Sequence, residues 1–64
     1  MYCYAIYYGA KQVRVFPHEI TGIDWHRAEA LAIDFARKAR QEWQVPDVTI
    51  EHFNSSGVGS TVRF

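Results

Sequence analysis

The chain has 64 residues, 48% of them hydrophobic, and its seven basic and seven acidic side chains cancel to a formal charge of zero. That length fits one domain spanning residues 1–64, and a chain this short often needs a disulfide, a metal ion or a partner subunit for stability. The single cysteine, Cys3, excludes an internal disulfide and fits a reducing, cytoplasmic setting. Zero net charge argues against non-specific nucleic-acid binding, and the absence of a signal-peptide pattern or a long apolar run predicts no membrane partner.

The first part of the chain predicts a β-hairpin. Residues 2–8 are aromatic and β-branched in composition, and residues 11–16 form a second short strand. Gly9 opens a two-residue loop that favours a type II′ turn. Continued without interruption, this register turns four residues toward the core: Tyr4, Ile6, Val13 and Val15. The other side of the hairpin then carries Cys3, Ala5, Tyr7, Arg14 and Phe16.

Residues 24–43 carry the long helical pattern of the chain. Asp24 is a favourable N-cap, basic residues gather late as the helix dipole prefers, and Pro46 bars continuation. At 100° per residue, one apolar stripe forms, and four of its members are alanines that let a helix lie close to a sheet. The stripe consists of Trp25, Ala28, Leu31, Ala32, Phe35, Ala36, Ala39 and Trp43.

The last part of the chain predicts a second hairpin, with strands over 48–53 and 58–64. Pairing Ile50 with Val62 keeps the apolar residues together and leaves a turn around 54–57. The element order is therefore ββαββ, and a right-handed crossover places the first strand between the second and the third. These features predict an α+β two-layer sandwich: a four-stranded antiparallel sheet in the order 2-1-3-4, with one helix packed on one face.

Residues able to perform catalysis or bind metals are scattered along the chain. Cys3, His18, His26 and His52 show none of the paired spacings of zinc sites, and no two carboxylates are forced into one pocket. The glycine-containing stretch 55–60 precedes a strand, so it lacks the helix N-terminus that a phosphate loop uses. The sequence therefore predicts a protein that is not an enzyme and has neither a metal nor a cofactor.

Two surfaces carry residue types that are common at binding sites. The first is the uncovered sheet face, whose rings and guanidinium groups suit protein contact, single-stranded nucleic acid or a second copy of the chain. The second is the late part of the helix, where a solvated charged face and a lone exposed isoleucine are the ordinary alternatives. Zero net charge and the absence of an RNA-binding aromatic motif favour a protein partner. The predicted partner-binding residues are Arg14, Phe16, Ile33, Arg37, Lys38, Arg40 and Arg63.

The layout resembles that of small phage-encoded inhibitors, anti-CRISPR proteins among them. The resemblance rests on chain length, single-cysteine use and the ββαββ order, and it implies stoichiometric inhibition of a larger nucleoprotein complex by surface binding. A second similarity is to dodecin-like flavin-binding oligomers, from which this chain departs by an additional N-terminal strand and by carrying Trp25 and Trp43 on the helix. The main prediction is thus a small non-enzymatic protein-binding module. A single-stranded nucleic-acid-binding domain and a ligand-binding homo-oligomer are the alternatives.

Overall fold

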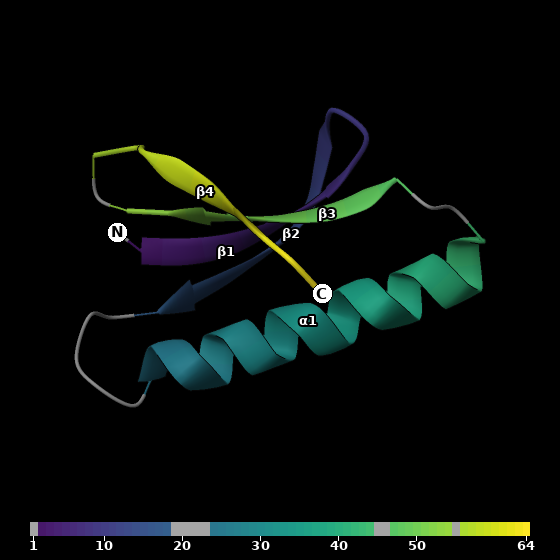
Figure 1. Cartoon of the computed structure of the whole chain (residues 1–64), viewed down its shortest axis with the longest axis horizontal. Helices are drawn as coiled ribbons and strands as arrows, with labels where there is room; N and C mark the ends of the chain where they lie inside the picture. The colour runs from purple at the N-terminus through teal and green to yellow at the C-terminus, as the bar shows by residue number, and fades with distance from the viewer. Residues whose placement is uncertain (1, 19–23, 45–46, 55) are drawn as a thin grey trace.

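The computed structural model describes residues 2–18, 24–44, 47–54 and 56–64, with only the backbone of Asp24. Two hairpins flank one helix, and the elements are β1 (Tyr2–Tyr8), β2 (Lys11–His18), α1 (Asp24–Trp43), β3 (Val48–Phe53) and β4 (Gly59–Val62). The strands form one antiparallel sheet in the order β2-β1-β3-β4, and α1 packs against one face of it (Figure 1). The predicted α+β architecture and strand order are confirmed.

The helix has the predicted bounds, from Asp24 to Trp43. The predicted cap by the side chain of Asp24 and the predicted stop at Pro46 lie outside the described residues. Gln44 follows the helix with a φ of 52°. This left-handed conformation is typical of the residue that ends a helix.

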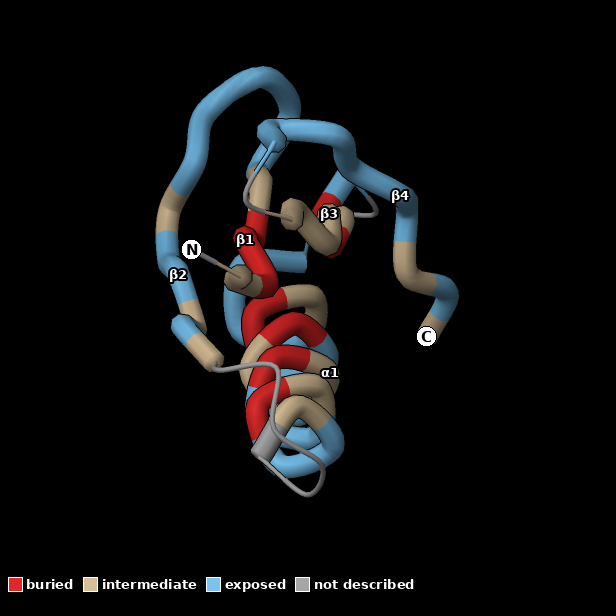
Figure 2. The backbone as a smooth tube through the Cα atoms, turned by 90° about the vertical axis from the view of Figure 1, so that its left-hand side faces the viewer, coloured by how far each residue is buried: buried red, intermediate tan, exposed pale blue. Residues whose placement is uncertain are grey.

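The core lies between α1 and the inner faces of β1 and β3. Four residues on the helix-facing side of the sheet are at most 2% exposed, namely Tyr4, Ile6, Val48 and Ile50. They face four buried alanines of the helix, Ala28, Ala32, Ala36 and Ala39. Small side chains let the helix approach the sheet closely, and the bulky side chains of the strands fill the space between them. Figure 2 shows this buried centre, with the largely exposed β2 and β4 on either side of it.

The first hairpin departs from the predicted register beyond its turn. The turn itself is as predicted, with a φ of 60° at Gly9. Further along, Ile6 pairs with Arg14 instead of the predicted Val13. Val13 is therefore an extra residue in β2, that is, a β-bulge.

The bulge reverses the faces of the residues that follow it. Phe16 pairs with Tyr4 and so faces the helix, whereas Val15 lies on the uncovered face and is 37% exposed. The predictions that Val15 points at the helix, and that Arg14 and Phe16 lie on the uncovered face, are wrong. Val13 and Phe16 are three residues apart, so a regular strand would turn them to opposite faces. With the bulge both pack against the core, and the larger ring of Phe16, half-buried, takes the place expected for Val15.

The buried stripe of α1 is also turned relative to the predicted one. Leu31 and Trp43, both predicted to lie in the core, are 50% and 43% exposed. Ile33, predicted among the charged residues, is half-buried and packs against the core. The stripe is centred on the alanines because large side chains of the strands fill the space between helix and sheet. Only small side chains of the helix fit where it comes closest to the sheet.

The second hairpin has the predicted register, with Ile50 paired to Val62. Asn54 organises the loop between β3 and β4, because its Oδ1 accepts hydrogen bonds from two backbone N–H groups of the loop at 2.9 and 3.1 Å. Gly57 takes a φ of 81° in the same loop. This local side-chain capping is the usual reason that asparagine and glycine occur in turns.

Candidate functional site

The seven predicted partner-binding residues lie on β2, on α1 and after β4. Three of them are built into the fold, namely Phe16, Ile33 and Arg40. The other four are exposed and lie on different elements: Arg14 on β2, Arg37 and Lys38 on α1, and Arg63 after β4. Arg37 and Lys38 are neighbours on α1, and Arg14 lies 5.5 Å from the ring of Phe35 on the same helix.

Arg40 connects the end of the helix to the sheet. Its Nη2 donates a hydrogen bond to the backbone carbonyl of Val48 at 3.1 Å, and its guanidinium carbon lies 4.0 Å from the ring centroid of Phe64. Its Nε is buried and has no hydrogen-bond partner among the described residues. A guanidinium held in this way stabilises the contact between the helix and the sheet.

Arg14 covers the junction between β2 and α1. Its guanidinium carbon lies 5.3 Å from the ring of Phe16 and 5.5 Å from that of Phe35, and these two rings meet edge-on. Lys38 forms an i,i+4 ion pair with Asp34, with Nζ and Oδ2 3.1 Å apart. Both side chains of that pair are exposed, so it contributes little to stability.

The two sheet edges are poor sites for the addition of another strand. β2 carries the bulge at Val13, a proline at Pro17 and the basic side chains of Lys11 and Arg14. β4 spans only Gly59–Val62. Bulges, prolines, charges and short edge strands all oppose edge-to-edge pairing. A partner is therefore expected to be contacted through side chains.

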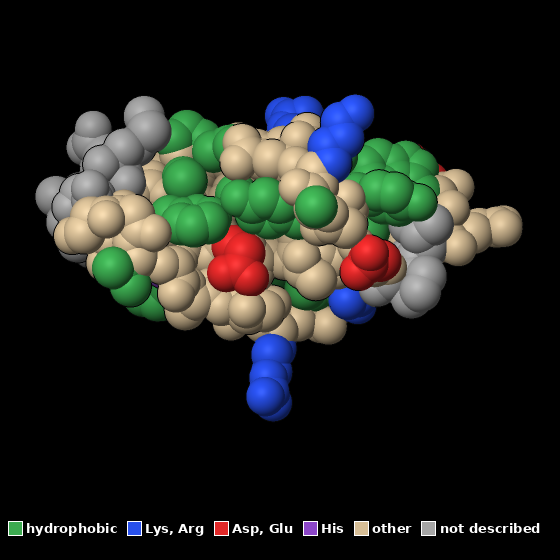
Figure 3. All heavy atoms as spheres, turned by 90° about the horizontal axis from the view of Figure 1, so that it is seen from above, with side chains coloured by type: hydrophobic (Ala, Val, Ile, Leu, Met, Phe, Trp, Pro, Cys, Tyr) green, Lys and Arg blue, Asp and Glu red, His purple; other side chains and the backbone are tan. Residues whose placement is uncertain are grey.

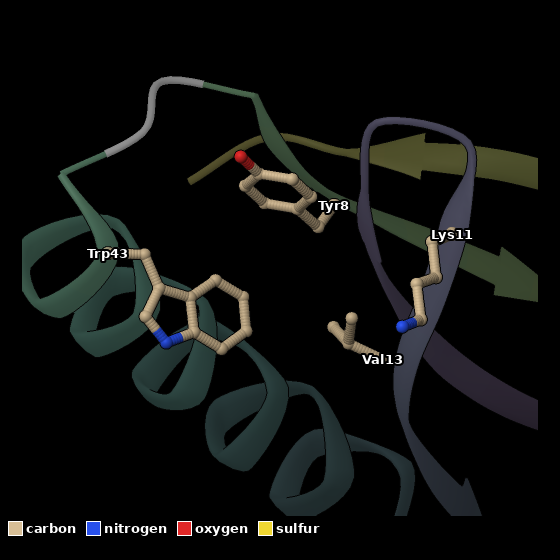
Figure 4. A pocket seen from close by; sticks show the side chains of 4 residues that line it. All are labelled: Tyr8, Lys11, Val13 and Trp43. Carbon is tan, nitrogen blue, oxygen red and sulfur yellow. The ribbon is translucent and has the colours of Figure 1, made fainter.

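Two exposed aromatic rings lie together where β1 and α1 end. Tyr8 and Trp43 are 42% and 43% exposed, and their rings meet edge-to-face with centroids 5.9 Å apart. Beside them is a hollow of about 290 Å³ whose other lining residues are Val13 and Lys11 (Figure 4). A second hollow, of about 220 Å³, shares Trp43 and is otherwise lined by Phe35, Lys38, Ala39 and Glu42. We call the four residues around the first hollow, Tyr8, Lys11, Val13 and Trp43, the Trp43 surface.

The uncovered face of the sheet is mainly apolar. Strand pairing places on it Cys3, Ala5, Tyr7, Val15, Pro17, Thr49, Glu51, Phe53 and Thr61. Seen over the sheet, hydrophobic side chains form a band along the molecule, with acidic side chains beside it and lysine and arginine side chains further out (Figure 3). Glu51 accepts a hydrogen bond from Thr61 Oγ1 at 2.9 Å. This face therefore lacks the Arg14 and Phe16 platform that the sequence predicted for it.

A cluster of three rings occupies the helix-facing side of the sheet near the start of β1. The Nε2 atoms of His18 and His52 are 3.0 Å apart. Tyr4 stacks on His52 with centroids 4.5 Å apart and lies 5.1 Å from His18. Burial, and secondly His18, lower the pKa of His52, while Glu29 acts in the opposite direction. Burial raises the pKa of the Tyr4 hydroxyl, and Glu29 adds to that shift.

Sequence reasoning missed this cluster because its histidines come from strands far apart in the chain. One signal was present, since His52 alternates with the core residues Val48 and Ile50. The position of His18 depends on the bulge, which strand alternation does not predict.

No protein-family model, curated protein or solved structure matches this chain. In the parts of the chain that the structure describes, no helix is long and apolar enough to cross a membrane. Within the same residues, no three or more His, Cys, Asp or Glu side chains come together as a metal site. The candidate surfaces are therefore judged by their own geometry.

Proposed function

We propose that this chain is a non-enzymatic protein-binding module that contacts a larger protein or nucleoprotein complex through the Trp43 surface. The observation that carries the proposal is the pair of exposed rings, Tyr8 and Trp43, beside an apolar hollow. Tryptophan and tyrosine are enriched among the residues that contribute most to protein interfaces. Rings left exposed on so small a domain forgo stabilising burial, and a partner that covers them restores it.

The shape and charge of this surface favour a protein over a small molecule or a nucleic acid. The two hollows, of about 290 and 220 Å³, are smaller than most drug-sized ligand sites. Trp43 lines both hollows, and side chains of a partner can fit into them on either side of its ring. Lys11 lines the first hollow, and the basic Lys38 and the acidic Glu42 both line the second. The hollows therefore do not form the continuous positive groove that single-stranded nucleic acid requires.

The role that follows is stoichiometric: one chain occupies one site on its partner, as an inhibitor or an accessory protein. The test compares Trp43→Ser with Leu31→Ser. Both residues are exposed on α1, but Leu31 lines neither hollow. Wild-type protein captures partners from a bacterial lysate, and the captured protein is then purified and titrated with wild type and both variants.

The expected result is that Trp43→Ser weakens binding at least about tenfold, while Leu31→Ser changes it by less than about threefold. Equal affinities of the two variants would contradict the proposed surface. Binding that nuclease treatment removes, and that falls steeply with salt, would favour the nucleic-acid alternative.

Light scattering over a concentration series tests whether a second copy covers the surface instead. A monomer at all concentrations is expected for the wild-type chain. A stable dimer that Trp43→Ser dissociates would contradict a larger partner at this site.

A further inference from the structure

Two imidazoles from different strands point their ring nitrogens at each other. His18 is the last residue of β2 and His52 belongs to β3, with β1 between the two strands. The Nε2 atoms are 3.0 Å apart, whereas the ring centroids are 5.1 Å apart and the ring planes differ by 26°. The nitrogens are thus much closer than the ring centres, so the rings meet by their Nε2 edges.

We propose that His18 and His52 bind a divalent ion of the Ni²⁺, Cu²⁺ and Zn²⁺ class through their two Nε2 atoms. Two imidazole nitrogens bound at about 2.0–2.1 Å, at angles between square and tetrahedral, lie about 2.9 to 3.4 Å apart. The observed 3.0 Å falls within that range. Imidazole suits these ions, whereas Mg²⁺ and Ca²⁺ prefer oxygen ligands.

The number of protons on the two imidazoles allows a metal ion to replace the hydrogen bond between them. At 3.0 Å one Nε2–H donates to the other Nε2. For both nitrogens to bind a metal ion, the proton of the donating ring moves from Nε2 to Nδ1. Both histidines then bind as neutral imidazoles, and no net proton is taken up or lost by the pair.

The surroundings provide access and support. A hollow of about 260 Å³, lined by Tyr2, His18, Trp25 and His52, adjoins the pair and leaves room for water at the remaining coordination positions. Among the described residues these two histidines are the ligands offered, and water can occupy the remaining positions. The ring of Tyr4, stacked on His52, fixes the orientation of one ligand before the ion arrives.

Trp25 makes the proposal testable, because it lines the same hollow and its fluorescence is quenched by a nearby open-shell ion. The experiment uses the full untagged chain with Trp43→Phe, so that Trp25 is the one remaining tryptophan. The probe is NiCl₂, since Cu²⁺ can oxidise Cys3. ZnCl₂, which does not quench, serves as a competitor, and MgCl₂ serves as a negative control.

The expected result is saturable quenching by one Ni²⁺ per chain, reversed by Zn²⁺ and absent with Mg²⁺. Replacing either ligand, His52→Gln or His18→Gln, should weaken Ni²⁺ binding at least about tenfold. Circular dichroism checks that each variant is folded, and His18 at a strand end is the second variant if His52→Gln does not fold. His26→Ala is the matched control, because His26 is exposed and its ring centroid lies 3.6 Å from that of Trp25.

Three outcomes would overturn the proposal. Quenching that never saturates would indicate collisional contact only. Unchanged affinity in folded His52→Gln and His18→Gln variants would exclude these ligands. Loss of binding in His26→Ala alone would place the ion at His26 instead.

Discussion

Replacing Arg40 with alanine tests whether a residue predicted for partner binding instead holds the fold together. The substitution removes the hydrogen bond to the Val48 carbonyl, 3.1 Å long, and the guanidinium that lies 4.0 Å from the centroid of the Phe64 ring. It also removes the aliphatic part of a half-buried side chain. The contact between the last turns of α1 and the sheet should therefore weaken.

The size of the loss follows from these contacts. A hydrogen bond to a charged group contributes about 1.5–3 kcal/mol, and a guanidinium over an aromatic ring about 0.5–2 kcal/mol. Part of this is offset in the wild-type protein, because Nε of Arg40 is buried without a partner among the described residues. We therefore expect the free energy of unfolding to fall by about 2–3 kcal/mol. A domain of this length rarely gains more than about 3–5 kcal/mol from its core, so the loss is a large fraction of its stability.

Urea unfolding followed by circular dichroism measures this change. Arg37→Ala is the control, because Arg37 is exposed on the same helix, and its loss should stay within about 0.5 kcal/mol. Arg40→Met keeps an unbranched apolar side chain but no donor, and should fall between the two. Equally small losses for Arg40→Ala and Arg37→Ala would show that the contacts to Val48 and Phe64 do not stabilise the fold.

Two further substitutions test the packing and the end of the helix by the same unfolding assay. Ala36→Leu should lower the free energy of unfolding by about 1–3 kcal/mol, because Ala36 is fully buried against the sheet. Ala30→Leu, on the exposed face of the same helix, should be close to neutral. Equal effects of the two substitutions would contradict the close approach of the helix to the sheet. Gln44→Gly should raise the free energy of unfolding by up to about 1 kcal/mol, because glycine adopts the observed φ of 52° without strain. Gln41→Gly, inside the helix, should lower the free energy of unfolding by about 1 kcal/mol. A destabilised Gln44→Gly variant would show that the helix does not end in this conformation.

The element order and the strand order could be predicted because local signals settle each of them. Gly9 sets the first turn, Asn54 and Gly57 mark the second, and one apolar stripe identifies the helix. The handedness of the crossover then leaves β1 at the centre of the sheet. None of these steps depends on the detailed packing of side chains.

Which residues of β2 face the helix could not be predicted, because the alternation of side chains between the two faces of a sheet assumes a regular strand. A bulge shifts the alternation of the residues that follow it by one position. Here the helix presents Phe35, against which Phe16 packs. The predicted apolar stripe of α1 was partly wrong for a related reason. The angular positions of the residues counted the large Leu31 in the same way as the alanines, although the sheet leaves room only for small side chains.

The candidate sites depend on the same long-range packing. Tyr8 and Trp43 are the last residues of β1 and α1, and only the helix placement brings their rings together. The histidine pair requires both the strand order and the shifted register of β2. The resemblance to small phage-encoded inhibitors rested on layout, which does not locate a contact surface, so that role remains a prediction.

The bulge at Val13 connects the fold to the proposed binding surface. In the regular register Val13 would pair with Ile6, but the bulge gives that place to Arg14, and Val13 lines the hollow beside Tyr8 and Trp43. The same shift turns the rest of β2 over, so that its aromatic ring packs on α1 and its edge is less suited to strand pairing. One extra residue thus protects the sheet edge and shapes the apolar hollow next to it. This arrangement favours a partner that inserts side chains into the hollow over one that extends the sheet.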